Sequence, residues 1–257
     1  MNKISIIIPA YNEEKRIGKT IGCYLDYFKS LKKKKELDFE IIVVLNACKD
    51  NTLKVVKKYK CKELRILNFE QGGKGFAIIE GFKDALERKN DLMGFVDADM
   101  ATAPEAFYEL IKNIKDYDGI IASRYIKGSK KENSIIRTIV SRIFNLIVRG
   151  IFLMNYRDTQ CGAKLFKKVS VQKILPVLGE TEWAFDVDLL YIAKKKGVKI
   201  KEFPTVWQEK GVSKLKVIKS SMQMFLAIVK LRIINSPFKR ITKIHLVRAI
   251  FYLAKSL

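Results

Sequence analysis

Phe95-Val96-Asp97-Ala98-Asp99 closes an apolar run that begins at Met93 and places two carboxylates one residue apart. An apolar run this short, bounded by charge, is typical of a buried strand in a covered sheet. The carboxyl end of such a strand opens into the ligand crevice of an α/β fold. Two acids there repel each other, and a hard divalent cation suits their oxygens while leaving room for a substrate's phosphates. The pair predicts a metal–diphosphate site; the alternative is an acidic, solvated turn.

The composition limits the class of protein. The 257 residues, of which 48% are hydrophobic, suffice for one large α/β domain with an appendage. Lys and Arg number 50 against 27 Asp and Glu, and the net charge of +23 implies an anionic partner: nucleic acid, an acidic membrane face or a phosphorylated substrate. The four cysteines form no Cys-x-x-Cys pair and His245 is the one histidine, which argues against a zinc site and fits a reducing, cytosolic setting.

Strands and helices are predicted to alternate along the first half of the chain. Apolar runs predict strands over residues 4–8, 39–45, 64–68, 93–96 and 119–123, with helices between most of them. This alternation predicts a largely parallel sheet flanked by helices. Further along, the pattern predicts a polar loop over 128–135, a long helix over 136–154 and strands over 163–166 and 199–203.

Gln71-Gly72-Gly73-Lys74-Gly75 precedes a predicted helix that runs through Ala85. Glycines let the backbone approach a ligand, and a helix N-terminus attracts an anion. Lys74 adds a positive charge at the same place. The spacing is not that of a Walker loop, so the segment does not define a phosphate site by itself.

Residues 210–257 contain 11 Lys and Arg and no Asp or Glu. Their pattern predicts two amphipathic helices broken near Pro237. Apolar faces beside basic residues are typical of helices that lie in the interface of an anionic bilayer. A helix packed on the domain, or one that pairs with a second subunit, is the alternative. We expect a catalytic unit over 1–215 and a membrane-association segment over 216–257, with no signal peptide and no run near the ~20 residues that span a bilayer.

Taken together, the motifs resemble the inverting family 2 glycosyltransferases, which have the GT-A (Rossmann-like) fold. Three stretches follow the family's order and spacing: Pro9-Ala10-Tyr11-Asn12-Glu13-Glu14, Asp97-Ala98-Asp99 and Ser123-Arg124-Tyr125. Three later stretches look like the dolichyl-phosphate β-glucosyltransferases: Asp158-Thr159-Gln160-Cys161-Gly162-Ala163-Lys164-Leu165-Phe166, Trp183-Ala184-Phe185-Asp186-Val187-Asp188-Leu189-Leu190 and Ser213-Lys214-Leu215. The resemblance covers roughly residues 3–235.

The resemblance implies the transfer of a hexose, glucose before mannose, from a nucleotide sugar to dolichyl or another polyprenyl phosphate. UDP-glucose is favoured over GDP-mannose as the donor. Mg²⁺ or Mn²⁺ is the expected cofactor, and a β-linked lipid-phosphate sugar is the expected product. The acceptor phosphate is already an anion at neutral pH, so a strong base is not required. The harder task is to stabilise charge on the departing diphosphate, which a metal does as a Lewis acid.

The same resemblance assigns roles to residues. The nucleotide ligands are Pro9, Tyr11, Glu13, Asn46, Lys74 and Asp97. The acceptor-phosphate ligands are Arg124, Arg137, Ser213 and Lys214. The catalytic set is Asp97, Asp99, Asp186, Arg124 and Lys214, in which Asp97 and Asp99 hold the metal and Asp186 orders sugar hydroxyls or assists proton movement.

One motif departs from the family. Leu45-Asn46-Ala47-Cys48-Lys49-Asp50 stands where the family has two aspartates followed by Gly-Ser. Asn46 can donate as well as accept a hydrogen bond, whereas an aspartate only accepts. The choice between uridine and guanosine is therefore open at the level of sequence.

Two other functions are compatible with parts of the sequence. A family 2 enzyme could act on a soluble or growing glycan, although the basic, apolar C-terminus speaks against it. The charge of +23 also suits a nucleic-acid-binding protein, but the sequence has no such module, and the basic residues of the C-terminus alternate with aliphatic rather than aromatic ones. We therefore expect no nucleic-acid partner, and a peripheral location on the cytoplasmic face of a membrane.

Overall fold

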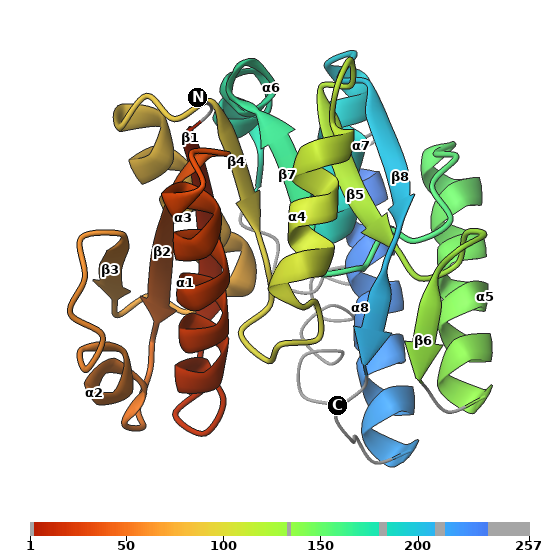
Figure 1. Ribbon diagram of the computed structural model, residues 1–257. Helices are drawn as coiled ribbons and strands as arrows, with labels where there is room; N and C mark the ends of the chain where they lie inside the picture. The colour runs from red at the N-terminus through yellow and green to blue at the C-terminus, as the bar shows by residue number, and fades with distance from the viewer. Residues whose placement is uncertain (1–2, 133–134, 180–183, 209–213, 236–257) are drawn as a thin grey trace.

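The computed structural model describes residues 3–132, 135–179, 184–208 and 214–235 (Figure 1). The elements, in chain order, are β1 (Lys3–Ala10), α1 (Ile17–Lys33), β2 (Asp38–Asn46), α2 (Thr52–Val56), β3 (Leu64–Phe69), α3 (Lys74–Glu87), β4 (Leu92–Phe95), α4 (Pro104–Asn113), β5 (Gly119–Ser123), β6 (Lys130–Glu132), α5 (Ile135–Phe152), β7 (Lys164–Lys167), α6 (Lys168–Ile174), the 3₁₀ helix η1 (Leu175–Val177), α7 (Phe185–Lys195), β8 (Ile200–Pro204), β9 (Val206–Gln208) and α8 (Lys214–Ile234).

A seven-stranded sheet, in the order β3-β2-β1-β4-β7-β5-β8, forms the centre of the molecule. β1 pairs in parallel with β2 and β4, β2 with β3, and β5 with β8. The exception is β7, which lies between β4 and β5 and is antiparallel to both. The predicted α/β architecture with a largely parallel sheet is confirmed, and the continuous burial of β1 and β2 is what helices on both faces require.

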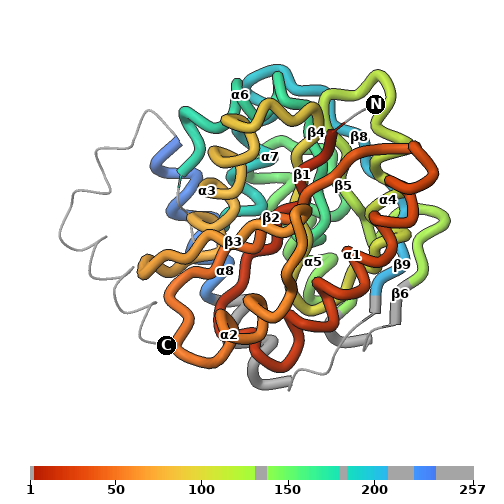
Figure 2. Tube along the Cα trace, turned by 60° about the vertical axis from the view of Figure 1, so that its left-hand side comes forward, coloured from red at the N-terminus to blue at the C-terminus, as the bar shows by residue number. Residues whose placement is uncertain are grey.

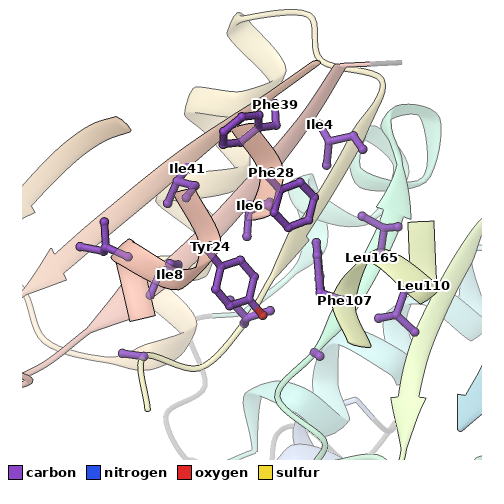
Figure 3. Packing of buried hydrophobic residues seen from close by; sticks show 14 of the residues in the cluster. Ile4, Ile6, Ile8, Tyr24, Phe28, Phe39, Ile41, Phe107, Leu110 and Leu165 are labelled. Carbon is purple, nitrogen blue, oxygen red and sulfur yellow. The ribbon is translucent and has the colours of Figure 1, made fainter. Parts of the chain in front are cut away.

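Helices cover both faces of the sheet (Figure 2). On one face, Ile4, Ile6 and Ile8 of β1 pack against α1 and α4; Figure 3 shows Tyr24, Phe28 and Phe107 in this cluster. On the other face, Ile7 of β1 packs with side chains of α3, α6 and α7. The period-two alternation along β1 therefore divides its isoleucines between two cores.

The C-terminal part of the described chain packs beside β8. Ile228 and Leu231 of α8 are buried in a third cluster with Phe144 and Val148 of α5 and Leu190 of α7. The second predicted C-terminal helix, beyond Pro237, lies outside the described residues. None of the helices in the described part of the chain combines the length and the apolar character that crossing a bilayer requires.

The predicted loop over 128–135 is wrong for Lys130–Glu132 and for Ile135, which begins α5. Lys130–Glu132 forms β6, which pairs in parallel with β9 in a separate two-stranded sheet. The amide of Lys130 donates to the carbonyl of Thr205 at 3.0 Å. The segment is polar, and its strand depends on backbone hydrogen bonds rather than on a buried apolar face, so apolar periodicity could not reveal it.

Gly94, in the middle of β4, is predicted to be required by packing. A Cβ at this position would lie 2.5 Å from the carbonyl oxygen of Lys164 and 2.8 Å from the ring of Phe107. The backbone carbonyl of Lys164 would have to move to admit the methyl group. We therefore expect Gly94→Ala to lower the free energy of unfolding by about 2 kcal/mol in urea denaturation. Gly150→Ala in α5 is the control, because nothing lies within 4 Å of its added Cβ. Equal urea midpoints for the two variants would contradict the packing argument.

Candidate active site

The predicted nucleotide and metal residues converge at one edge of the sheet. The parallel strands β2, β1 and β4 are adjacent in this order, and Asn46, Tyr11 and Asp97 end or follow them at the edge where their carboxyl ends lie (Figure 1). Tyr11 is 56% exposed, whereas Asn46 is buried and its Oδ1 has no hydrogen-bond partner among the described residues. Pro9 is buried within β1 opposite Val44, and β1 extends two residues beyond the strand predicted over residues 4–8.

The loop that carries Asp97 and Asp99 is held by α1. Thr20 Oγ1 donates to the carbonyl of Ala98 at 2.6 Å, and Tyr24 Oη donates to the carbonyl of Thr102 at 2.9 Å. Both carboxylates are half-buried, and Asp99 Oδ1 accepts a hydrogen bond from the amide of Ala101 at 2.9 Å. The two acids therefore occupy a fixed loop rather than a solvated turn.

Asp97 also lies directly against the backbone of Gly162. A Cβ at that glycine would be 1.8 Å from Asp97 Oδ2, so no other residue type fits without moving the carboxylate. This contact joins two motifs that are far apart in the sequence. The glycine of the Asp158–Phe166 motif is thus part of the wall behind the acidic pair.

Two lysines and two carboxylates form a row of alternating charge, here called the charge row: Asp97, Lys74, Asp186 and Lys164. Lys74 Nζ lies 2.8 Å from Asp97 Oδ1 and 3.3 Å from Asp186 Oδ2. Lys164 Nζ lies 2.6 Å from Asp186 Oδ1 and donates to the carbonyl of Cys161 at 2.7 Å. Both ammonium groups also lie over the ring of Phe95, at 5.8 and 5.4 Å from its centroid.

The ion pairs shift the pKa values of Lys74 and Asp186. Burial lowers the pKa of Lys74, but Asp186 and Asp97 outweigh burial and hold it above its ordinary value. Burial raises the pKa of Asp186, but Lys164 and Lys74 outweigh burial and hold it below its ordinary value. Asp186 is therefore a carboxylate at neutral pH, and a carboxyl group with a depressed pKa is a weak proton acceptor. Its two predicted roles at the sugar stay predictions.

Lys164 is the functional residue that sequence reasoning missed. Its side chain is completely buried in β7, between the carbonyl of Cys161 and the carboxylate of Asp186. The available signal was a charged residue inside the apolar run Ala163-Lys164-Leu165-Phe166, because a buried lysine requires a paired carboxylate.

Lys74 owes its position to the glycines before it. Gly73 has a φ of 124°, which only glycine adopts without strain, and α3 begins at the next residue. Lys74 is thus the first residue of α3, and its ammonium lies beside Asp97. An anionic ligand at the N-terminus of this helix would meet the ammonium as well.

Arg124 forms a bidentate ion pair with Asp158. Its Nε and Nη2 donate to Asp158 Oδ2 and Oδ1 at 2.7 and 2.9 Å, and its backbone amide donates to Oδ2 at 2.9 Å. Burial lowers the pKa of Arg124, but the Asp158 carboxylate outweighs burial and raises it. The guanidinium also lies 5.2 Å from the ring of Trp207, which is itself buried. Asp158 thus supports the predicted phosphate ligand as its counter-ion.

Glu13 is also paired. Its carboxylate receives two hydrogen bonds of 2.7 Å from Arg16, and that ion pair, followed by Asp99 and Asp97, raises the pKa of Arg16. Arg137 and Lys214 belong to α5 and α8, but their side chains lie outside the described part of the structure, as do Ser213 and Trp183. Their predicted contacts with the acceptor phosphate stay predictions.

The donor set suits a cation that also binds phosphate. Among the described residues, no three Asp, Glu, His or Cys side chains lie close enough together to hold a metal ion. Asp97 and Asp99 supply carboxylate oxygens on a fixed loop, and Mg²⁺ is commonly bound by one or two carboxylates with the remaining positions left to water and substrate phosphates. The residues present therefore fit Mg²⁺ or Mn²⁺.

The chain belongs to glycosyl transferase family 2, whose sequence profile matches residues 5–175. It is 34% identical over 225 residues to a dolichyl-phosphate beta-glucosyltransferase of Trichomonas vaginalis, covering 83% of this chain and 66% of that one. It is 34% identical over 249 residues to the dolichyl-phosphate beta-glucosyltransferase of Dictyostelium discoideum, covering 89% of this chain and 73% of that one. It thus spans about two thirds to three quarters of the length of these relatives.

Solved structures share the fold. Glucosyl-3-phosphoglycerate synthase of Mycobacterium tuberculosis, crystallised with Mn²⁺, uridine diphosphate and glucosyl-3-phosphoglycerate, superposes with a TM-score of 0.64. The match covers 89% of this chain and 79% of the synthase at 16% identity. The family resemblance and the GT-A fold predicted from the sequence are confirmed, and the chain is a glycosyltransferase.

The charge row generates a prediction for the pH dependence of stability. Asp186→Asn removes the carboxylate between two ammonium groups, and we expect it to cost about 3 kcal/mol of unfolding free energy at pH 7. Because the folded pKa of Asp186 is lowered, its contribution is present above the unfolded value of about 4 and is lost as the pH falls through the folded value. Urea denaturation from pH 7 to pH 3 should show the gap between wild type and variant closing only below about pH 4.

Asp116→Asn is the matched control, because Asp116 is an exposed carboxylate. Its unfolding free energy should follow that of the wild type throughout. A gap for Asp186→Asn that is constant down to pH 3, or absent at pH 7, would contradict the charge row.

Proposed function

We propose that the chain transfers glucose from UDP-glucose to dolichyl or another polyprenyl phosphate, with inversion, at a membrane surface. The observation that carries the proposal is its likeness, over 83% and 89% of its length, to two proteins named dolichyl-phosphate beta-glucosyltransferase. UDP-glucose is proposed before GDP-mannose because both relatives are named for glucose.

Asp97 and Asp99 are proposed to hold Mg²⁺ or Mn²⁺, which when bound supplies Lewis-acid neutralisation of the departing diphosphate. Lys74 contributes a second positive charge beside Asp97, together with the N-terminus of α3. Tyr11 is exposed at the same edge and available to the nucleobase. The side-chain oxygen of buried Asn46, which has no partner among the described residues, is available to an N–H group of the nucleobase. Glu13 is proposed to act with Arg16 as a pair at the ribose.

The transfer step needs no protein base. An oxygen of the acceptor phosphate forms the new bond to the anomeric carbon, and the bond from that carbon to the diphosphate oxygen breaks with its electron pair. No proton has to move, because both the nucleophile and the leaving group are anions. Asp186, kept ionised by Lys164 and Lys74, is suited to accept hydrogen bonds from sugar hydroxyls with its remaining lone pairs.

The acceptor phosphate is proposed to lie on the side of Arg124, with Arg137, Ser213 and Lys214 as further ligands. Arg124 is held in place by Asp158, and a guanidinium has more N–H donors than the two that this carboxylate occupies. The basic segment over residues 216–257 is proposed to associate with an anionic membrane at the cytoplasmic face. Its lack of acidic side chains supports this location.

A donor screen tests the proposal. Purified protein with Mn²⁺ and a polyprenyl phosphate is expected to form lipid-linked glucose from UDP-glucose and none, or far less, from GDP-mannose, as measured by mass spectrometry of the lipid product. Asp99→Asn should reduce turnover by at least about 100-fold, since neutralisation of the leaving group is the main source of rate. Asp116→Asn should retain wild-type turnover. Absence of lipid-linked product from every nucleotide sugar would refute the proposal.

The contact between Lys74 and Asp97 gives a separate prediction for metal affinity. Lys74→Met removes a cation that competes for Asp97, so we expect Mn²⁺ to bind the free enzyme several-fold more tightly, with weaker turnover. Electron paramagnetic resonance of free Mn²⁺ measures the affinity. Lys83→Met, which removes an exposed lysine of the same helix paired with Glu80, should leave the affinity unchanged. Weaker Mn²⁺ binding by Lys74→Met would show that the lysine does not compete with the metal.

A further inference from the structure

The outer face of α5 exposes large apolar side chains. Ile139, Ile143 and Leu146 are 52%, 53% and 67% exposed, and Leu153, just beyond the helix, is 74% exposed. Their spacing places the first three on one side of the helix. The opposite side, with Phe144 and Val148, is buried against α7 and α8. α5 is thus apolar on two sides, of which only one is covered in the described structure.

The charged residues of α5 and α8 are all positive. Arg142 and Arg149 are exposed on α5, which contains no Asp or Glu. The neighbouring α8 also contains no acid, and its Arg232 Nε donates to the carbonyl of Ile151 at 3.1 Å. Figure 1 shows α5 at the right-hand edge of the molecule. We call Ile139, Ile143, Leu146 and Leu153, with Arg142 and Arg149, the α5 surface.

The helix that bears this surface also forms part of the site. Asn145 Oδ1 accepts hydrogen bonds from the amide and hydroxyl of Thr159, at 2.8 and 2.9 Å. The Arg142 guanidinium lies 5.8 Å from the ring of Tyr125, next to Arg124. Whatever binds the α5 surface therefore lies close to the side of the site that carries the buried arginine.

We infer that the α5 surface docks on an anionic lipid bilayer, with its aliphatic side chains at the boundary of headgroups and acyl chains and its arginines against lipid phosphates. A broad apolar stripe flanked by basic residues is the pattern of helices that lie in a membrane interface. The inference deepens the proposed function, on which it rests for the lipid nature of the acceptor. It adds a docking element within the catalytic domain to the predicted association of residues 216–257.

Charge argues against two other occupants. In a two-fold pair of chains the same patch meets itself, so the arginines of each copy would face those of the other. The chain's own residues 236–257 contain five Lys and Arg and no acid, so they would also bring positive charge to a positive face. An anionic bilayer complements both the apolar and the basic parts of the α5 surface.

Vesicle flotation of the full chain tests the inference. Ile143→Ser/Leu146→Ser should lower the partition coefficient on phosphatidylcholine–phosphatidylserine vesicles at least about tenfold, because two exposed aliphatic side chains lose their burial in lipid. Val169→Ser/Val177→Ser, on α6 and η1, is the matched control with side chains 59% and 48% exposed, and should float like the wild type. Arg142→Gln/Arg149→Gln should weaken flotation on anionic vesicles and leave any binding to pure phosphatidylcholine unchanged.

Direct contact is tested with Leu146→Trp, whose fluorescence should be quenched by brominated acyl chains, unlike that of Val169→Trp. Flotation of Ile143→Ser/Leu146→Ser equal to that of the wild type would overturn the inference. The inference would also be overturned if light scattering showed a dimer that these substitutions dissociate while flotation stays unchanged.

Transfer to a short, water-soluble polyprenyl phosphate separates this inference from the proposed function. Ile143→Ser/Leu146→Ser should keep wild-type turnover with that acceptor while it loses vesicle binding. If the wild type transfers sugar to no polyprenyl phosphate, the proposed function fails, and the flotation result still decides the docking surface.

Discussion

The arrangement of the site depends on the charge row at the carboxyl edge of the sheet, which runs from Asp97 through Lys74 and Asp186 to Lys164. Lys164 is completely buried and would not be stable there as an ion without Asp186. Asp186 in turn holds Lys74, which reaches Asp97. These ion pairs join the start of α3, the loop after β4, strand β7 and the start of α7.

The antiparallel strand β7 makes this row possible. If β7 were parallel to β4 and β5, its first residues would lie at the opposite edge of the sheet, where those strands begin. Instead β7 is antiparallel between β4 and β5, so its first residue, Lys164, and Gly162 just before it lie beside the carboxyl end of β4. The glycine admits the Asp97 carboxylate and the lysine neutralises Asp186. The segment that leads into β7 therefore supplies the glycine that leaves room for Asp97 and the lysine that pairs with Asp186.

A second buried ion pair, Arg124 with Asp158, connects the site to the outside of the molecule. Asp158 precedes Thr159, which is hydrogen-bonded to Asn145 of α5. The same helix carries the exposed apolar and basic surface. A lipid acceptor has its phosphate at the boundary between water and hydrocarbon, so an enzyme that uses one has to bring its phosphate ligands to that boundary. α5 carries the exposed apolar and basic surface and also contacts the loop that holds Asp158, the partner of Arg124.

The sequence alone determined the parallel α/β sheet, because runs of β-branched residues alternating with helical periodicity are local patterns. It also located Asp97, Asp99 and Lys74, because each follows or begins an element whose end lies at the ligand edge. Tertiary structure alone decided the direction of β7, the pairing of β6 with β9, the partners of Arg124 and Lys164, and which side of α5 is left exposed. Lys74 and Asp186 are 112 residues apart, and periodicity carries no information about which distant charges the chain brings together.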